Sequence, residues 1–442
     1  MLMHNLVIAW KSLKRNRILS SLIVTGIALG IALSTTFATI RHSFAKDPIP
    51  EKSNVLYNVR LDSWDPLKPY PARVPGEPPT QITYRDAMEI MKSSIPLRQS
   101  AMYKTNLYVH PDPKVGKPFK EQIRACFADF FPMFNVPFKY GSGWDKKGDV
   151  GPEAVVVLNE EMNEKLFGGA NSVGKTVRIE DKDFRVVGVL GPWFPSIKFY
   201  DLTQNQLQPP EKLFIPFNHL VPMNLRTGGN SDGWGPSPNL PGIAGLLGSE
   251  TCWLQMWVEL PKKSDLSAYQ DFLKAYAMEQ KKIGRFPRPV NNRVSSVKEW
   301  MDLAGVVPAQ ANALVVVSLL FLAVCALNLV GLLLGKFLAR AAEIGVRRAL
   351  GASRLDIFLQ HVVECELIGV LGGVLGISLS LLTLAYMNNW MKTLVNRTDF
   401  FKLDAEMVVM AVGLSLAAGL VAGLYPAWRT CKLAPAIHLK VQ

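Results

Sequence analysis

The order of the apolar segments constrains this chain of 442 residues most strongly. One charge-free apolar run, residues 18–40, precedes a long stretch of mixed composition, and three more runs follow at 311–338, 367–387 and 407–425. At 1.5 Å of rise per residue, the first run reaches about 34 Å as a helix, which is enough to cross the hydrocarbon core of a bilayer. The sequence therefore predicts four transmembrane helices in a one-plus-three arrangement, with both termini on the same side.

Basic residues mark one side of the expected membrane. Lys11, Lys14, Arg15 and Arg17 precede the first run, Lys336, Arg340, Arg347, Arg348 and Arg354 lie between the second and third, and Arg429, Lys432 and Lys440 follow the fourth. Because Lys and Arg next to a span are retained in the cytoplasm, we expect both termini inside and residues 41–308 outside. Many charges behind the net charge of +13 are explained in this way, so no nucleic-acid partner is expected.

The N-terminal segment allows more than one interpretation. Residues 1–17 place Leu2, Leu6 and Trp10 at helical spacing, which predicts an amphipathic helix. This helix either lies along the inner membrane surface or extends the first span into the cytoplasm. A cleaved signal peptide is the alternative for residues 18–40, but that run exceeds the usual apolar region of about 7–15 residues. We therefore expect a retained span.

The external segment mixes helical and strand patterns, which predicts an α+β domain. In chain order we expect a helix opened by a capping box at Thr83, a strand at 154–158, a helix at 159–167 ended by Gly168, a hairpin at 176–190, a strand at 253–260, a helix from Ser264 to Gly284 and a helix at 297–303. The proline-rich residues 62–80 and the glycine-rich residues 223–248 are expected to form loops.

The cysteines and histidines suggest no metal chemistry. Cys126 and Cys252 fall in the segment expected outside the cytoplasm, where a disulfide could form. A domain of this size can also build a core without a disulfide, and two buried free thiols are the preferred interpretation. The six histidines are scattered without ligand spacing, so no metal site is expected.

Residues 169–176 satisfy the phosphate-loop pattern GxxxxGK[ST]. A phosphate loop follows a strand and opens a helix, so that backbone N–H groups converge on the phosphates. Here a helical segment precedes the pattern and a strand-like segment follows it, which predicts a helix-to-strand turn that binds no nucleotide. The sequence also contains no LSGGQ-like segment and no run of four apolar residues ending in Asp-Glu. We therefore expect no ATPase domain in this chain.

Residues 340–357 carry the most informative motif. They predict a short amphipathic helix, a break at Gly351 and a second helix, capped by Ser353, that continues into the third span. Such a helix could dock in a groove on a partner protein. A basic cytoplasmic loop without a partner is the alternative interpretation.

This stretch resembles the EIGxRRALGAxxxDI loop of the MacB and FtsX-like ABC transporter permeases, the type VII ABC superfamily. Residues 372–376 resemble the LGGxLG run of the family's third span. Residues 423–435 resemble its GxxPAxRAxxLxP ending, with Pro426 and Arg429 at matching positions. In the external segment, residues 166–189 are similar to the family's LFG, PxGK and VVGV blocks.

The resemblance implies a dimer of identical or related permeases that works with separate ABC ATPase subunits. ATP is then used by the partner ATPase, and no cofactor is bound directly. The ATPase-coupling helix would comprise Glu343, Gly345, Arg347, Arg348, Ala349, Gly351, Ala352 and Arg354. Family members with a large external domain often engage a periplasmic adaptor and an outer-membrane channel, which implies an inner-membrane protein.

The domain boundaries follow from the apolar runs and the resemblance. We expect an amphipathic cytoplasmic helix at 1–17, spans at 18–40, 309–338, 359–388 and 406–426, a periplasmic domain at 41–308, a cytoplasmic coupling loop at 339–358, a short periplasmic loop at 389–405 and a cytoplasmic tail at 427–442. The periplasmic domain is expected to contain two subdomains, about 41–110 with 251–308 and about 111–250.

The preferred function is the permease subunit of an ATP-driven export complex, which transmits ATPase motions to the periplasmic domain. An FtsX-like regulator of a periplasmic cell-wall hydrolase and a lipoprotein-releasing permease are the alternatives. No Gly-x-Ser-x-Gly or His-Glu-x-x-His arrangement indicates an autonomous enzyme. Glu364 and Glu366, near the start of the third span, are expected at the cytoplasmic interface or paired with Arg347, Arg354 or a partner.

Overall fold

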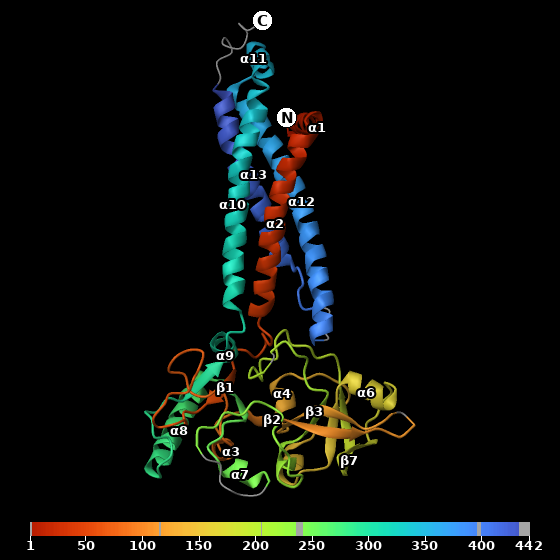
Figure 1. The fold of residues 1–442 in the computed structure, drawn as a ribbon, viewed down its shortest axis with the longest axis vertical. Helices are drawn as coiled ribbons and strands as arrows, with labels where there is room; N and C mark the ends of the chain where they lie inside the picture. The colour runs from red at the N-terminus through yellow and green to blue at the C-terminus, as the bar shows by residue number, and fades with distance from the viewer. Residues whose placement is uncertain (1, 115, 205, 236–241, 396–398, 433–442) are drawn as a thin grey trace. The chain divides into compact units, whose positions relative to one another are not determined.

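The computed structural model describes residues 2–114, 116–204, 206–235, 242–395 and 399–432. The chain divides into two compact units. The helical unit contains Met1–Ala45 and Val307–Gln442, and the sheet unit contains Lys46–Val306. The predicted class is confirmed: four helices that are long and apolar enough to cross a membrane flank an α+β segment in the chain (Figure 1).

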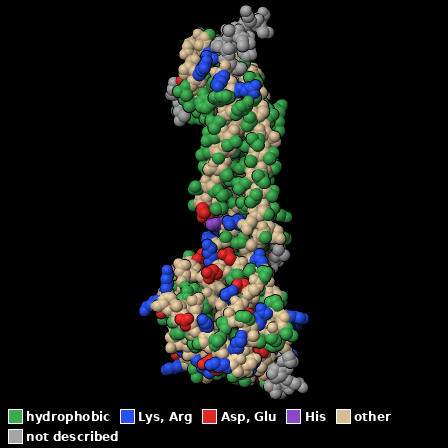
Figure 2. Space-filling model, turned by 90° about the vertical axis from the view of Figure 1, so that its left-hand side faces the viewer, with side chains coloured by type: hydrophobic (Ala, Val, Ile, Leu, Met, Phe, Trp, Pro, Cys, Tyr) green, Lys and Arg blue, Asp and Glu red, His purple; other side chains and the backbone are tan. Residues whose placement is uncertain are grey.

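The helical unit is a bundle built from long apolar helices. Its elements are α1 (Leu2–Arg15), α2 (Arg17–Ala45), α10 (Ala309–Leu338), α11 (Ala341–Ala349), α12 (Arg354–Val395) and α13 (Ala405–Cys431). On the face shown in Figure 2, hydrophobic side chains run along the length of this unit, and Lys and Arg side chains gather toward one end. Helices α1 and α11 lie at the same end of the bundle (Figure 1). The predicted amphipathic helix at the N-terminus is confirmed as α1, which is separated from α2 at Asn16.

Helix α12 is longer than the sequence predicts. It begins at Arg354, inside the expected loop, and continues to Val395, beyond the expected end of the span at residue 388. Residues 388–395 contain neither glycine nor proline, so nothing in this sequence stops the helix. Asn388 then joins the returning chain, because its side-chain amide exchanges hydrogen bonds of 2.9 Å with both the N–H and the C=O of Phe401.

Glycines bring the long helices close together. A Cβ at Gly372 would lie 2.6 Å from the Ile27 side chain of α2, and a Cβ at Gly376 would lie 2.8 Å from the carbonyl oxygen of Ala28. On another face of α12, a Cβ at Gly373 would lie 2.7 Å from the Ser415 side chain of α13. Small residues permit such close backbone approach between membrane helices. The predicted glycine run therefore positions α12 against two neighbours.

The sheet unit contains one ten-stranded sheet. Its strands are β1 (Leu56–Arg60), β2 (Arg98–His110), β3 (Phe119–Cys126), β4 (Phe138–Gly141), β5 (Val155–Leu158), β6 (Thr176–Ile179), β7 (Lys182–Leu190), β8 (Leu213–Pro216), β9 (Gln255–Glu259) and β10 (Arg293–Ser296). The spatial order is β10-β1-β9-β2-β3-β8-β5-β7-β4, with β6 paired to β2 and β7. Strands from both of the subdomains expected from the sequence thus belong to one sheet. The boundary between these subdomains stays a prediction.

Short helices and one long helix complete the sheet unit. They are α3 (Tyr84–Ile90), α4 (Phe130–Met133), α5 (Lys146–Val150), α6 (Glu160–Phe167), the 3-10 helix Phe217–Leu220, α7 (Ala244–Gly248), α8 (Lys263–Lys282) and α9 (Val297–Ala304). The predicted local signals are confirmed where Thr83 caps α3 and where Gly168, at φ 66°, ends α6. Strands β6 and β7 form the expected hairpin. Cys126 and Cys252 are buried free thiols.

A buried charge network ties the segment between β7 and β8 to the sheet. Arg124 of β3 forms ion pairs with Asp201, at 2.6 Å, and with Glu211, while Lys198 Nζ lies 3.2 Å from the Glu211 carboxylate. Lys104 of β2 pairs with Asp201 at 3.0 Å. Burial by itself would raise the pKa of Glu211, but attraction to Arg124 and Lys198 outweighs it and lowers that pKa to about 2. The same balance lowers the pKa of Asp201.

Glu211→Gln should destabilise the sheet unit by about 2 kcal/mol at pH 7, because Arg124 and Lys198 lose a buried charge-assisted partner. Chemical unfolding of the full chain in detergent, followed by tryptophan fluorescence, measures this loss. Since the folded-state pKa is lowered, the contribution is complete above the unfolded value of 4.5 and is lost as the pH falls toward about 2. Wild type and variant should converge across this window, and a constant difference would contradict the assignment.

Candidate coupling site

The segment between α10 and α12 folds as its sequence signals predict. Helix α11 ends at Ala349 with Leu350 as its C-cap, and Gly351 follows at φ 100°, a left-handed conformation that favours glycine. A reciprocal cap then opens α12: the Asp356 N–H donates to Ser353 Oγ at 3.1 Å, and the Ser353 N–H donates to Asp356 Oδ2 at 3.2 Å. The helix, the break and the capped second helix are all confirmed.

The apolar residues of α11 divide between two faces. Ile344 is buried and forms a small core with Ile357 of α12 and Cys431 of α13. Leu350, by contrast, is 83% exposed, and Val346 is 47% exposed. Of these three residues, only Ile344 belongs to the buried core with α12 and α13. The outer face is therefore available to another molecule.

The residues predicted for ATPase coupling serve partly to hold this segment together. Arg347 donates to Glu343 Oε1 at 2.7 Å and to Gln360 Oε1 at 3.1 Å, which links α11 to α12. Glu343 also lies 3.7 Å from the Arg15 guanidinium of α1. The remaining predicted residues are buried Gly345, half-buried Arg348 and Ala352, and exposed Ala349, Gly351 and Arg354. All eight lie within one short stretch at the end of the bundle.

Helix α1 contributes to the same site, which the sequence did not predict. A groove of about 370 Å³ is lined by Asn5 and Ile8 of α1, by Arg347 and Leu350 at α11, and by Ala352, Asp356, Ile357, Leu359 and Gln360 beside and in α12. The helical spacing of apolar residues in the first seventeen positions was the available signal. That pattern identifies an amphipathic helix but does not identify what the helix packs against.

A buried ion-pair cluster lies about one helical turn along α12 from Gln360, which lines the groove. Glu364 of α12 is fully buried and lies 2.7 Å from Lys336 Nζ of α10. The Arg340 guanidinium, between α10 and α11, lies 3.8 Å from the same carboxylate, and the Ser12 hydroxyl of α1 donates to it. Of the alternatives expected for Glu364, pairing with Arg347 or Arg354 is not formed, because those side chains lie on α11 and at the start of α12, whereas Glu364 pairs with Lys336 and Arg340. A position at the cytoplasmic interface stays a prediction.

The C-terminal motif lies largely inside a helix. Pro426 is buried within α13, and Arg429 donates to the Tyr425 hydroxyl at 3.0 Å. A Cβ at Gly423 would lie 2.4 Å from Cys365, so this glycine permits close packing of α13 against α12. The last motif residues, 433–435, and Lys440 lie outside the described part of the chain.

The phosphate-loop pattern is a turn in the structure. Residues 169–175 connect α6 to β6, so a helix precedes the pattern and a strand follows it, as the sequence predicted. Lys175 Nζ lies 5.1 Å from the centre of the Phe167 ring. No helix N-terminus follows Lys175 to hold a phosphate group.

The described residues thus contain four helices that are long and apolar enough to cross a membrane, a large sheet unit, and a short helix, α11, between the second and third of these long helices. Residues 20–276 match the MacB-like periplasmic core domain, and residues 315–435 match the FtsX-like permease C-terminal domain. The first match covers more than half of the chain. The chain therefore belongs to the MacB/FtsX-like family of type VII ABC permeases, and its sheet unit is a periplasmic domain.

Named relatives agree with this assignment. The macrolide export ATP-binding/permease protein MacB of Syntrophobacter fumaroxidans is 25% identical over 341 residues, which cover 71% of this chain and 46% of that protein. The pyoverdine export ATP-binding/permease protein PvdT of Pseudomonas putida is 24% identical over 445 residues, which cover 98% of this chain and 59% of that protein. The chain thus spans about half the length of the curated relatives it matches.

Among solved structures, the periplasmic region of MacB from Actinobacillus actinomycetemcomitans aligns with a TM-score of 0.36 and 14% identity. The alignment covers 57% of this chain and 94% of that structure. The extracellular domain of the transporter YknZ from Gram-positive bacteria aligns with a TM-score of 0.33 and 12% identity.

Proposed function

We propose that this chain is the permease subunit of an ATP-driven ABC export complex, in which a separate ABC ATPase docks on the exposed face of α11 and the start of α12. The observation that carries this proposal is the exposure of Val346, Leu350 and Leu355 next to Arg354. Exposed apolar side chains beside charged ones are typical of protein–protein interfaces. In this proposal the partner ATPase binds and hydrolyses ATP, and this chain binds no cofactor directly.

The buried ion-pair cluster around Glu364 provides a route for transmission. Glu364 connects α12 to Lys336 of α10 and to Ser12 of α1, so displacement of one helix end is resisted by the other two. Helices α2 and α10 continue in the chain into the periplasmic domain, at Ala45 and Val307. We infer that ATPase closure shifts these helices together and thereby changes the periplasmic domain.

The basic residues at the coupling end support a cytoplasmic location for both termini, in the inner membrane. A second permease, identical or related, completes the complex, because ABC ATPases of this family are expected to act in pairs. A periplasmic adaptor and an outer-membrane channel belong to the same proposal. The two relatives are named as a macrolide exporter and a pyoverdine exporter. Because these compounds differ, the proposal names no particular cargo for this chain.

Co-purification tests the composition of the complex. The full chain is purified from its native membrane in mild detergent after light crosslinking, and its partners are identified by mass spectrometry. An ABC ATPase together with an adaptor or an outer-membrane channel is the expected result. An ATPase with a cell-wall hydrolase would instead favour an FtsX-like regulator, and the absence of any ATPase would contradict the docking role of α11.

A further inference from the structure

Helix α1 presents an apolar stripe on the side that faces away from the bundle. Four large apolar side chains recur there at the spacing of one helix face, and each is at least 40% exposed: Met3, Leu6, Val7 and Trp10. The other side of the helix is buried, at Ala9, Ser12 and Leu13. Single exposed apolar residues are ordinary, but a contiguous row of this length indicates contact with another molecule or with a membrane.

The buried side of α1 determines how deep the helix lies. Leu13 belongs to the apolar core of the bundle, together with Ile23 of α2 and Phe337 of α10. Figure 1 shows α1 end-on beside the end of α2, so α1 runs crosswise to the long helices of this unit. Only Asn16 separates α1 from α2, which is long and apolar enough to cross a membrane. A crosswise helix at the end of a span lies in the interfacial layer of the bilayer, where its exposed side meets lipid.

Basic side chains border the apolar stripe. Lys11 and Lys14 are exposed, and Lys14 Nζ lies 5.5 Å from the centre of the Trp10 ring. Among the described residues neither lysine forms an ion pair, whereas the neighbouring Arg15 lies 3.7 Å from Glu343 of α11. The sequence of α1 contains no acidic residue. In an interfacial helix, apolar side chains lie among the acyl chains while lysines reach the headgroups, where they attract negative charge.

We propose that the exposed face of α1 binds anionic phospholipid in the leaflet at this end of the bundle. The apolar stripe enters the interface, and the ammonium groups of Lys11 and Lys14 pair with lipid phosphate groups. Anionic headgroups are favoured over zwitterionic ones, because a zwitterionic headgroup also carries a positive charge that the lysines repel. The surface therefore selects lipid by charge.

The proposed ATPase surface lies on a different side of the same helix. Asn5 and Ile8 of α1 line the groove beside α11. Helical geometry places both residues about 140° or more around the helix from Trp10, which lies near the centre of the stripe. The face that binds lipid and the face beside the groove are thus separate, and lipid binding requires no ATPase.

Fluorescence quenching tests this proposal on the full chain, reconstituted without ATPase into phosphatidylcholine nanodiscs. A Val7→Cys variant carries a nitrobenzoxadiazole fluorophore, and the wild-type chain treated with the same reagent gives the background. The nanodiscs contain equal small fractions of nitroxide-labelled phosphatidylglycerol or nitroxide-labelled phosphatidylcholine. We expect both lipids to quench, with phosphatidylglycerol at least about fivefold more efficient, which is the factor that one lysine contributes near an anionic surface. Lys11→Gln with Lys14→Gln should bring the two efficiencies together.

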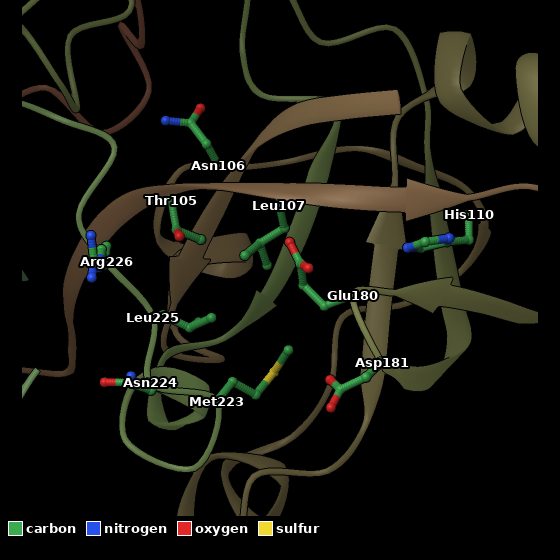
Figure 3. A pocket seen from close by; sticks show the side chains of 10 residues that line it. All are labelled: Thr105, Asn106, Leu107, His110, Glu180, Asp181, Met223, Asn224, Leu225 and Arg226. Atoms are coloured by element: carbon green, nitrogen blue, oxygen red, sulfur yellow. The ribbon is translucent and has the colours of Figure 1, made fainter. Parts of the chain in front are cut away.

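Two controls separate this contact from its surroundings. Arg226→Gln with Lys274→Gln removes the same number of exposed positive charges from the sheet unit, where Arg226 lines a pocket of about 540 Å³ (Figure 3). This double variant should keep the full preference for phosphatidylglycerol. A fluorophore attached through Leu350→Cys, at a residue that is 83% exposed next to α11, should be quenched less by both lipids than the fluorophore at position 7.

Three results would overturn the proposal. The first is an absence of quenching at position 7 by either lipid, which would show that the stripe faces water in the chain alone and favour the ATPase as its cover. The second is equal quenching by the two lipids, and the third is an unchanged preference after Lys11→Gln with Lys14→Gln. The unfolding midpoint of each variant shows that the chain is intact. Since the ATPase is left out, none of these results bears on its docking at α11.

Discussion

Leu350→Asp is expected to separate this chain from its ABC ATPase while leaving the chain folded in the membrane. Leu350 is 83% exposed at the end of α11, so the substitution removes little packing within the chain. If the leucine enters a pocket on the ATPase, a buried carboxylate there would cost 2 kcal/mol or more, which is about 30-fold or more in affinity. Co-purification of the ATPase with tagged full-length chain measures the loss.

Leu67→Asp provides a matched control for that variant. Leu67 is 87% exposed and lies in the periplasmic domain, so the same chemical change occurs at an equally exposed leucine away from α11. ATPase recovery with Leu67→Asp should equal that of wild type. If Leu350→Asp retained the ATPase as well as Leu67→Asp does, α11 would not be the docking surface.

Charge reversal at Arg347 and Arg348 is a less specific test of the same surface. Arg347 is bonded to Glu343 and Gln360, so its reversal would repel Glu343 on the same helix and release the link to α12. Reduced association is still expected, but it would combine loss of a contact with disorder of α11. This distinction depends on the structure, since the sequence shows both arginines only as charges on a short helix.

Local signals in the sequence were sufficient to predict much of this fold. Gly351 and Ser353 identified the break after α11 and the cap of α12, and Gly168 identified the end of α6, because each signal acts within a few residues. The four spans followed from length and hydropathy alone. The motifs between residues 340 and 435 were sufficient to identify the family, because they are specific short patterns.

Features that depend on distant contacts were not predictable in the same way. Helical periodicity placed Leu350 on an apolar face but could not show that nothing in the chain covers it. The cations that pair with Glu364, Lys336 and Arg340, were not among the alternatives that the sequence offered, because the choice among nearby cations depends on how α1, α10 and α12 pack. The pairing of β2 with β9 at residues 98–102 and with β6 at residues 109–110 likewise depends on strands that are distant in the sequence. No pattern within β2 encodes that arrangement.

Glu364→Ala should be among the most destabilising single substitutions in the helical unit. The glutamate is fully buried, and its removal leaves Lys336, whose side chain is 1% exposed, without its carboxylate at 2.7 Å. Breaking a buried pair from one side typically costs about 3–5 kcal/mol, because the remaining charge stays desolvated. Thermal unfolding of the purified full chain, followed by circular dichroism at a helical wavelength, should show a lowered midpoint.

Glu366→Ala separates the effect of the pair from the effect of losing an acidic side chain. Glu366 lies two residues away on α12, is half-buried, and forms no ion pair within the described ranges, so its removal should leave the midpoint unchanged or raise it. The double variant Lys336→Met with Glu364→Leu should recover much of the loss, because apolar groups of similar size can replace a buried pair. If Glu364→Ala and Glu366→Ala behaved alike, the cluster would not join α1, α10 and α12, and transmission from α11 would require another route.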